Sequence, residues 1–208
     1  VHTQALPGTP QHRQSIDRIL NAALTDAQAL ARAGFDAILL ENMHDRPYVL
    51  PPHPPETTAV LTRIAAAIRA AFPKLPLGIQ AFLVEREALS IALASGAQFI
   101  RCENFVFSHI ADEGLLCTAA AGPLLRYRRS IGADHIRIYA DIKKKHASHA
   151  ITGDLSLQET SRAAEFFSAD GLIVTGVATG EPTDPEDVRA VRTSSKLPLL
   201  VGSGVTSK

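Results

Sequence analysis

The chain of 208 residues is poor in cysteine and has no excess of charge of either sign. Its two cysteines, Cys102 and Cys117, are too few for a disulfide framework, and Cys102 falls inside a strand-like segment. This usage favours a soluble protein in a reducing intracellular compartment, the cytoplasm or an organelle matrix. The 21 basic residues balance the 21 acidic ones, which disfavours a nucleic-acid partner.

Long apolar runs are also missing. The longest uninterrupted runs are strand-sized, far short of the roughly 18 residues that a membrane-spanning helix needs, so no membrane span is expected. The first residues, Val1 to Gly8, contain neither the basic nor the apolar segment of a secretory signal. The chain also lacks the Gly-x-Gly-x-x-Gly turn that a Rossmann-type unit places after its first strand.

The sequence does contain a repeated segment. Residues 34–42, Gly-Phe-Asp-Ala-Ile-Leu-Leu-Glu-Asn, are echoed by residues 96–104, Gly-Ala-Gln-Phe-Ile-Arg-Cys-Glu-Asn. In each copy a helix-like segment ends at a glycine suited to a left-handed cap, and an apolar run then leads to Glu-Asn. Weaker echoes cover residues 132–141 and 169–176. Four strands therefore share one construction, and three of them end in a carboxylate or carboxamide.

Hydrophobic periodicity predicts strands and helices in alternation, which is typical of a parallel α/β sheet. The expected strands cover residues 1–6, 35–40, 77–82, 98–102, 135–140, 172–175 and 197–201. The expected helices cover residues 15–33, 60–72, 85–95, 119–131, 156–167 and 184–194, and residues 104–118 are expected to form a long loop.

This alternation predicts a TIM-type (β/α)8 barrel, with an open sheet wound on both faces as the competing architecture. The chain stops at Lys208, where the seventh helix would begin. We therefore expect one barrel domain over residues 1–208, truncated after its seventh strand and lacking its last helix, strand and helix. The first and seventh strands would then be unpaired edges, which favour a homo-oligomer or aggregation.

Candidate catalytic residues follow the expected strands. Glu41, Glu103 and Asp141 stand at strand carboxyl ends, which share one face of a barrel, and Lys143 stands two positions past Asp141. Buried carboxylates are costly unless they are paired or bind a cation. Either these groups bind a hard cation such as Mg²⁺, or they form an acid/base array with Lys143. In the purely structural alternative, each of these carboxylates only caps a helix or holds a loop by ion pairing.

The orientation of the two Glu-Asn pairs stays open, because alternation does not tell whether Glu41 or Asn42, and Glu103 or Asn104, faces the barrel lumen. The basic run Lys143-Lys144-Lys145 is either solvated surface or part of an anion site. His109 lies in the expected long loop and is interpreted as a polar residue of the rim.

Candidate phosphate-binding residues follow the last two strands. Gly202, Ser203 and Gly204 would let backbone amides approach an anion closely, and Thr175 with Gly176 would add donors. Phosphate-binding barrels build such sites from their last two strand-to-helix loops. A plain tight turn is the alternative for the Gly-Ser-Gly tip.

Several of these motifs together resemble the BtpA family over nearly the whole chain. The motifs are Leu-Pro-Gly-Thr-Pro at 6–10, Glu-Asn-Met-His-Asp at 41–45, Asp-Ile-Lys-Lys-Lys-His at 141–146, Val-Thr-Gly-Val-Ala-Thr-Gly at 174–180 and Val-Gly-Ser-Gly-Val at 201–205. The resemblance implies a barrel of the ribulose-phosphate-binding type. It also links family members in cyanobacteria to the biogenesis or stability of photosystem I.

Two functions follow as expectations. The first is an enzyme that binds or converts a small phosphorylated metabolite at the carboxyl ends of its strands, by acid/base or metal-assisted chemistry. The second is a non-catalytic assembly or stability factor that docks through the barrel exterior and the proline-rich residues 47–55.

Overall fold

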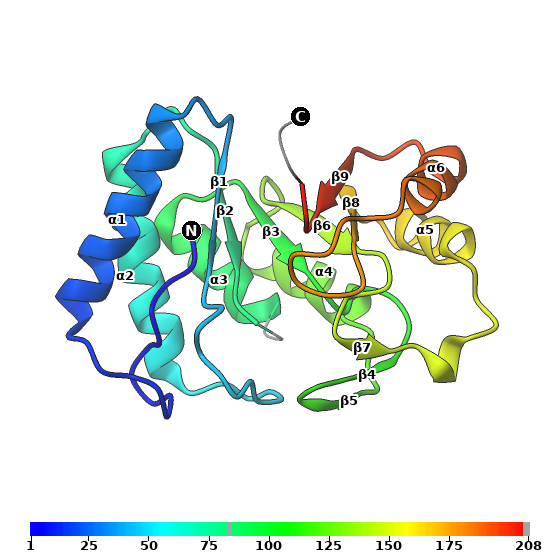
Figure 1. Cartoon of the computed structure of the whole chain (residues 1–208), viewed down its shortest axis with the longest axis horizontal. Coiled ribbons are helices and arrows are strands. Elements are labelled where there is room, and N and C mark those ends of the chain that lie inside the picture. Colours follow the sequence, from blue (N-terminus) through cyan, green and yellow to red (C-terminus); the bar gives the residue numbers. More distant parts are fainter. Residues whose placement is uncertain (83–84, 206–208) are drawn as a thin grey trace. The chain divides into compact units, whose positions relative to one another are not determined.

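The structure is a computed structural model that describes residues 1–82 and 85–205. The chain forms two compact units, residues 1–101 with 127–136 and residues 102–126 with 137 onward. In each unit, parallel strands alternate with helices, which confirms the expected α/β class (Figure 1).

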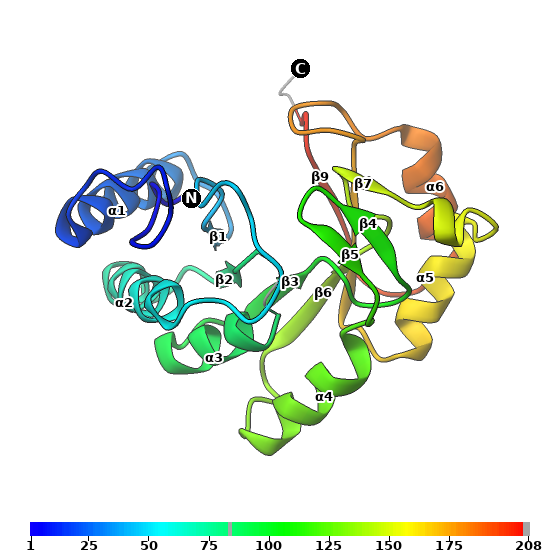
Figure 2. The ribbon, with the colours of Figure 1, turned by 90° about the horizontal axis from the view of Figure 1, so that it is seen from below.

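The first unit holds three parallel strands and the helices that connect them. In chain order its elements are α1 (Ile16–Arg32), β1 (Ile38–Glu41), α2 (Pro55–Ala71), β2 (Leu77–Gln80), α3 (Glu85–Ser95) and β3 (Phe99–Cys102), the last residue of which belongs to the second unit. Strand β2 pairs with β1 on one side and with β3 on the other. Helix α2 packs between α1 and α3, and the three helices lie on one side of the strands (Figure 2).

The expected first strand is much shorter than predicted. Residues 1–6 form a single parallel bridge, between His2 and Glu41. The backbone N–H of Thr3 donates to the carbonyl of Glu41 at 2.8 Å, and the N–H of Glu41 donates to the carbonyl of Val1 at 2.9 Å. The segment therefore runs alongside β1 and turns away at Pro7, which has no N–H for a further ladder bond.

The second unit combines parallel and antiparallel strands. Its elements are β4 (His109–Ala111), β5 (Gly114–Leu116), α4 (Ala121–Ser130), which continues into the first unit, β6 (Arg137–Asp141), β7 (Ala147–Ser148), a 3₁₀ turn (Ala150–Thr152), α5 (Leu157–Phe166), β8 (Gly171–Thr175), α6 (Pro185–Ser194) and β9 (Leu199–Gly202). Strand β8 pairs in parallel with β6 and with β9. Helices α5 and α6 pack side by side against β8.

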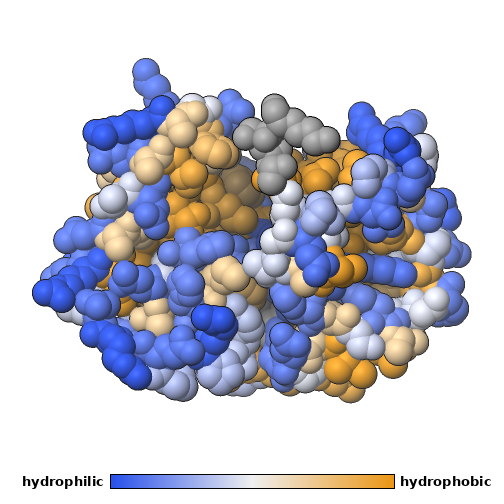
Figure 3. All heavy atoms as spheres, in the orientation of Figure 1, coloured by the Kyte–Doolittle hydropathy of each residue, from blue (hydrophilic) through white to orange (hydrophobic). Residues whose placement is uncertain are grey.

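The expected loop over residues 104–118 contains an antiparallel hairpin. Strand β4 pairs with β5 and with β7, which gives a three-stranded sheet in the order β5-β4-β7. Strands of two or three residues are too short for period-two alternation to reveal them. Ile110 and Leu115 lie opposite each other in the hairpin and are exposed, and Figure 3 shows apolar surface at the hairpin's position.

Helix ends follow the local sequence closely. The hydroxyl of Ser15 caps α1, and Ser156 with Glu159 forms the expected capping box of α5. The glycines that begin the two repeated segments, Gly34 and Gly96, follow the ends of α1 and α3 and have φ angles of 83° and 74°, in the left-handed region. These caps fix where each helix stops and therefore where the following strand begins.

Candidate functional site

Three of the predicted catalytic residues line one cavity in the second unit. Glu103 directly follows β3, Asp141 ends β6, and Lys143 follows two residues later. The cavity measures about 20 Å³, enough for one water molecule. The remaining lining residues are Val106, Phe107, Ser108, His109, Lys144, His149, Thr152 and Thr160.

The fourth predicted residue, Glu41, belongs to the first unit. It ends β1, is buried, and its Oε2 lies 3.7 Å from Nε2 of His2. The convergence of Glu41 with the other three residues therefore stays a prediction.

The two asparagines that follow the glutamates hold loops in place. Asn42 accepts a 3.0 Å hydrogen bond from the N–H of Phe82 and donates a 2.8 Å bond to the carboxylate of Asp45. Asn104 donates through Nδ2 to the carbonyl of Thr118 at 2.8 Å. In both repeated segments, the asparagine side chain thus bonds to nearby backbone.

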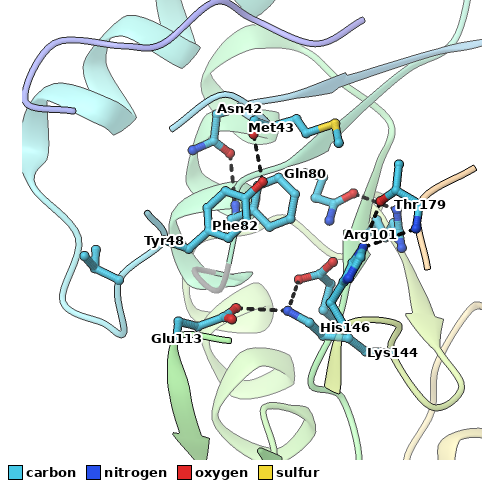
Figure 4. A network of polar contacts seen from close by, with 12 residues as sticks. Asn42, Met43, Tyr48, Gln80, Phe82, Arg101, Glu113, Lys144, His146 and Thr179 are labelled. Atoms are coloured by element: carbon cyan, nitrogen blue, oxygen red, sulfur yellow. Dashed lines mark hydrogen bonds and ion pairs between the residues drawn. The ribbon is translucent and has the colours of Figure 1, made fainter. Parts of the chain in front are cut away.

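One lysine that lines the cavity, Lys144, is buried between two carboxylates. Nζ of Lys144 lies 3.2 Å from Oε2 of Glu103 and 2.9 Å from Oε1 of Glu113 (Figure 4). The side chains of Lys144 and Glu103 are each 5% exposed, and that of Glu113 is 1% exposed. Burial alone would lower the pKa of the Lys144 ammonium, but the two carboxylates outweigh it and raise the pKa above its usual value.

Sequence reasoning did not separate Lys144 from its neighbours in the basic run. Its burial depends on Glu113, which lies 31 positions away in the unpredicted hairpin. No local pattern marks the middle lysine of three as the buried one.

Lys143 has a different environment from the one that strand continuation would give it. Strand β6 ends at Asp141, and the backbone of Lys143 is left-handed, with a φ angle of 56°. Its ammonium donates a 2.7 Å hydrogen bond to the carbonyl of Leu155. Asp141 and Lys143 nevertheless line the same cavity, because the turn after β6 brings both side chains to it.

His109 is the second residue whose importance the sequence did not reveal. It lies on β4, is 4% exposed, and its ring centroid is 5.3 Å from that of His149. Within the described part of the chain, its buried Nε2 has no hydrogen-bond partner. Burial, together with the positive charges of His149 and Lys144, lowers the pKa of His109 from 6.5 to about 4. The negative charges of Glu113 and Asp141 would raise this pKa, but their effect is smaller. His109 is therefore neutral at pH 7 and can offer one hydrogen bond to a molecule in the cavity.

This low pKa predicts that acidification destabilises the protein through His109. Below pH 6.5 the unfolded chain protonates His109, whereas the folded chain does so only near pH 4. The free energy of unfolding is therefore at its full value above pH 6.5, as far as His109 is concerned. It falls by roughly 2 kcal/mol as the pH drops toward 4, because the unfolded chain binds a proton that the folded chain does not. Urea unfolding at pH 7.5 and 4.5 should show a smaller loss for His109→Gln than for the wild type. The control His135→Gln replaces an exposed histidine and should lose as much stability on acidification as the wild type. Equal losses in all three proteins would contradict the low pKa of His109.

Hydrogen bonds join the loops that follow β6, β8 and β9. The N–H of Thr179 donates to Nε2 of His146 at 3.2 Å, so the loop after β8 contacts the loop after β6 (Figure 4). The N–H of Gly180 donates to Oγ of Ser203 at 3.2 Å, and that hydroxyl donates to the carbonyl of Ala178 at 2.9 Å. The loops after β6, β8 and β9 are therefore linked by hydrogen bonds, and we call this set of loops the connected rim. It includes the predicted phosphate-binding residues that follow β8 and β9.

The glycines of these tips allow two loops to approach each other closely. Thr175 ends β8 and lies opposite Gly202 in the parallel register. A Cβ atom on Gly176 would lie 2.3 Å from the carbonyl oxygen of Glu181, and one on Gly204 would lie 2.4 Å from the backbone nitrogen of Pro182. Close packing of the loops after β8 and β9 thus explains why both positions are glycine.

The described residues contain no group of three histidine, cysteine, aspartate or glutamate side chains arranged to hold a metal ion. Glu103, one of the expected Mg²⁺ ligands, pairs instead with the ammonium of Lys144.

In the part of the chain that the structure describes, no helix combines the length and the apolar character that a membrane crossing requires.

Comparison with known proteins identifies relatives over the whole chain. The model of the BtpA family matches residues 1–208. An uncharacterised mitochondrial protein of Caenorhabditis elegans is 42% identical, over 100% of this chain and 76% of the relative. The photosystem I biogenesis protein BtpA of Synechocystis is 33% identical, over 98% of this chain and 70% of the relative.

Solved structures share the fold at low sequence identity. A putative phosphonomutase of Burkholderia cenocepacia superimposes with a TM-score of 0.56 at 20% identity, covering 86% of this chain and 74% of that one. A 2,3-dimethylmalate lyase, a member of the PEP mutase/isocitrate lyase superfamily, gives a TM-score of 0.56 at 16% identity, covering 94% and 76%. The chain therefore has the α/β fold of these enzymes.

Proposed function

The chain belongs to the BtpA family, and on that premise we propose that it binds and converts a small phosphorylated metabolite by acid/base chemistry at the carboxyl ends of its strands. One observation carries the proposal: Glu103, Asp141 and Lys143 line a single small polar cavity together with a neutral, buried histidine. Carboxylates, ammonium groups and an imidazole held in one cavity are the groups that proton transfer requires.

The proposed roles follow from the contacts of each residue. Asp141 acts as the proton acceptor, because it ends β6 and lines the cavity together with His109, whereas Glu103 positions Lys144 through their ion pair. Lys143 and Lys144 supply positive charge to an anionic ligand. His109 offers a hydrogen bond from Nε2 to a polarised oxygen of the ligand, as a neutral imidazole can do near pH 7. Glu41 is proposed as a further carboxylate of the site.

The phosphate group is proposed to bind at the connected rim. The residues proposed to hold it are Thr175 and Gly176 after β8 and Gly202, Ser203 and Gly204 after β9. Backbone amides at such tips make anion-binding concavities. The likeness to a phosphonomutase and to a lyase of the PEP mutase/isocitrate lyase superfamily supports a site at the strand ends of a β/α barrel. Closure by an eighth strand and assembly into a homo-oligomer stay predictions, and Mg²⁺ remains the alternative partner of the carboxylates.

A non-catalytic assembly role is the second candidate. The Synechocystis relative carries the name of a photosystem I biogenesis protein, and the paired, exposed Ile110 and Leu115 on the hairpin offer an apolar contact surface. Under this alternative, the cavity would bind no small anion. The mitochondrial name of the Caenorhabditis elegans relative supports an organelle matrix as the compartment under either proposal.

The two candidates are separated by titration with inorganic phosphate and glycerol 3-phosphate at constant ionic strength. We expect calorimetry to detect binding to the wild type. Lys143→Met should weaken binding roughly tenfold or more, because it removes one charge-assisted contact. Lys145→Met is the matched control. Lys145 lies in the same loop after β6 as Lys143 but does not line the cavity. A wild type that binds neither compound would favour the assembly role, and equal losses in the two variants would contradict a specific role for Lys143.

A further inference from the structure

A larger cavity, of about 180 Å³, lies entirely within the first unit. It is enclosed by the turn at residues 7–10, the segment that follows β1, and the start of α2. Its walls are mostly apolar and include Pro7, Pro10, Pro47, Tyr48, Val49 and Pro54. An engineered apolar cavity of about 150 Å³ in another protein holds a benzene molecule, so this one has room for a six-membered ring.

The aromatic wall of this cavity is fixed in advance. The ring of Tyr48 stacks on that of Phe82 with a centroid distance of 4.3 Å and an interplanar angle of 16° (Figure 4). The Tyr48 hydroxyl donates a 2.7 Å hydrogen bond to the carbonyl of Met43. Phe82 does not line the cavity, so it supports the tyrosine ring from the other side. A ligand would therefore meet a preorganised aromatic surface.

A carboxylate that pairs with no lysine or arginine of the described residues also lines the cavity, as does His53, whose charge interacts with it. Asp45 is half-buried and accepts hydrogen bonds from the N–H of Leu6 at 2.7 Å and from Nδ2 of Asn42 at 2.8 Å. Burial raises the pKa of Asp45, although those hydrogen bonds oppose the shift. Asp45 forms no ion pair with any lysine or arginine among the described residues, and neither residue type lines the cavity. Because partly buried negative charge is stabilised by a nearby cation, the cavity favours a positively charged occupant.

The hydroxyl of a threonine provides a second polar group. Thr57 lies in the first turn of α2, is 7% exposed and lines the same cavity. Its side-chain hydroxyl makes no hydrogen bond to another described residue and is not sealed from the cavity surface, so it is available to a ligand. The N-terminal cap of α2 is Pro54, which has no side-chain group to bond there. Thr57 therefore presents an acceptor in the cavity that the carboxylate of Asp45 also lines.

We propose that this cavity binds a small cationic ring compound, with the ring against Tyr48 and the prolines and an ammonium group beside Asp45 and Thr57. An ammonium group has three donors and no acceptor, which matches a carboxylate and a hydroxyl that both accept. The face of an aromatic ring such as that of Tyr48 also attracts cations. Anions are disfavoured, because the site has a carboxylate and no lining lysine or arginine, and its one lining histidine, His53, already has Nε2 3.2 Å from the carbonyl oxygen of Val49. The cavity thus selects ligands of the opposite charge to the phosphorylated metabolite proposed for the second unit.

The test compares three ring compounds of similar size and different charge. Benzylamine, benzyl alcohol and benzoate are titrated into the 208-residue chain by calorimetry at pH 7.5. We expect benzylamine to bind at least about tenfold more tightly than benzyl alcohol, as expected for one charge-assisted hydrogen bond, and benzoate not to bind. Equal affinities for the three compounds, or no binding of benzylamine, would overturn the proposal.

Two variants locate the binding to this cavity. Asp45→Asn should abolish the preference for benzylamine over benzyl alcohol, whereas Asp36→Asn, which removes an exposed carboxylate of the same unit, should leave it unchanged. Since Asp45 also bonds to Leu6 and Asn42, thermal melts check that its variant folds. Thr57→Val preserves those bonds and should weaken benzylamine binding severalfold. Unchanged binding in a folded Asp45→Asn or Thr57→Val protein would contradict the site, as would an equal loss in Asp36→Asn.

Discussion

Replacing Lys144 with methionine is expected to lower the free energy of unfolding at pH 7 by about 3–5 kcal/mol, the usual cost of leaving one side of a buried ion pair uncompensated. Methionine has a similar length but no charge, so Glu103 and Glu113 would remain buried without their shared cation. Urea unfolding of the wild type and the variant measures the difference. This is the largest stability effect that we expect from a single substitution in the site.

The loss should depend on pH in a defined direction. Without Lys144 the two buried carboxylates would have raised pKa values in the folded state, so the folded variant would hold protons that the unfolded chain releases. The stability of the variant should therefore decrease as pH rises above the ordinary glutamate range near 4.3, and its deficit should be smaller at pH 5 than at pH 8. Lys145→Met controls for loss of a nearby charge, and adding Glu113→Gln to the variant should restore part of the stability. A deficit below 1 kcal/mol at both pH values would show that the cluster tolerates the loss.

Gly204→Ala is expected to weaken phosphate binding about a hundredfold while the chain still folds. The new Cβ would lie 2.4 Å from the nitrogen of Pro182, so the tip after β9 must move away from the loop after β8. Charge-assisted hydrogen bonds are worth roughly 1.5–3 kcal/mol each, so displacement of two backbone amides from a phosphate would account for this loss. Calorimetric titration with inorganic phosphate measures the affinity, and thermal melts measure the accompanying stability change.

Gly180→Ala provides the matched control for this substitution. Gly180 also has a left-handed backbone, with a φ angle of 86° against 59° for Gly204, but a Cβ atom there meets nothing within 4 Å. It should introduce similar backbone strain without displacing the tip. If both variants bind phosphate like the wild type, the tip only packs against its neighbour. If the wild type itself binds no phosphate, the proposed function fails as well.

Local patterns predicted most of the framework because each element carries its own boundaries. Ser15 and Ser156 begin helices, Gly34 and Gly96 close them, and the apolar runs between these points form parallel strands. The same patterns indicated that Glu103 and Asp141 stand at strand carboxyl ends. Hydrogen bonding and backbone conformation over a few neighbouring residues determine these features, so one sequence can reveal them.

The site itself depended on contacts between distant segments. Lys144 is buried because the hairpin places Glu113 against it, and His109 is neutral because β4 carries it into the same interior. Neither residue differs in sequence pattern from an exposed counterpart nearby. Burial of a charge is a property of the folded neighbourhood, which periodicity does not encode.

The hairpin makes the chemistry of the cavity depend on strand register. Neighbouring residues of a strand point to opposite faces, and on β4 the buried His109 is followed by the exposed Ile110. Deletion of one residue from the turn at 112–113 would shift the register of β4 by one position. An aliphatic side chain would then take the buried place of the His109 imidazole. The same deletion would remove or displace Glu113. Relatives with turns of different length are therefore expected to differ in what faces this cavity, even where every strand-end carboxylate is retained.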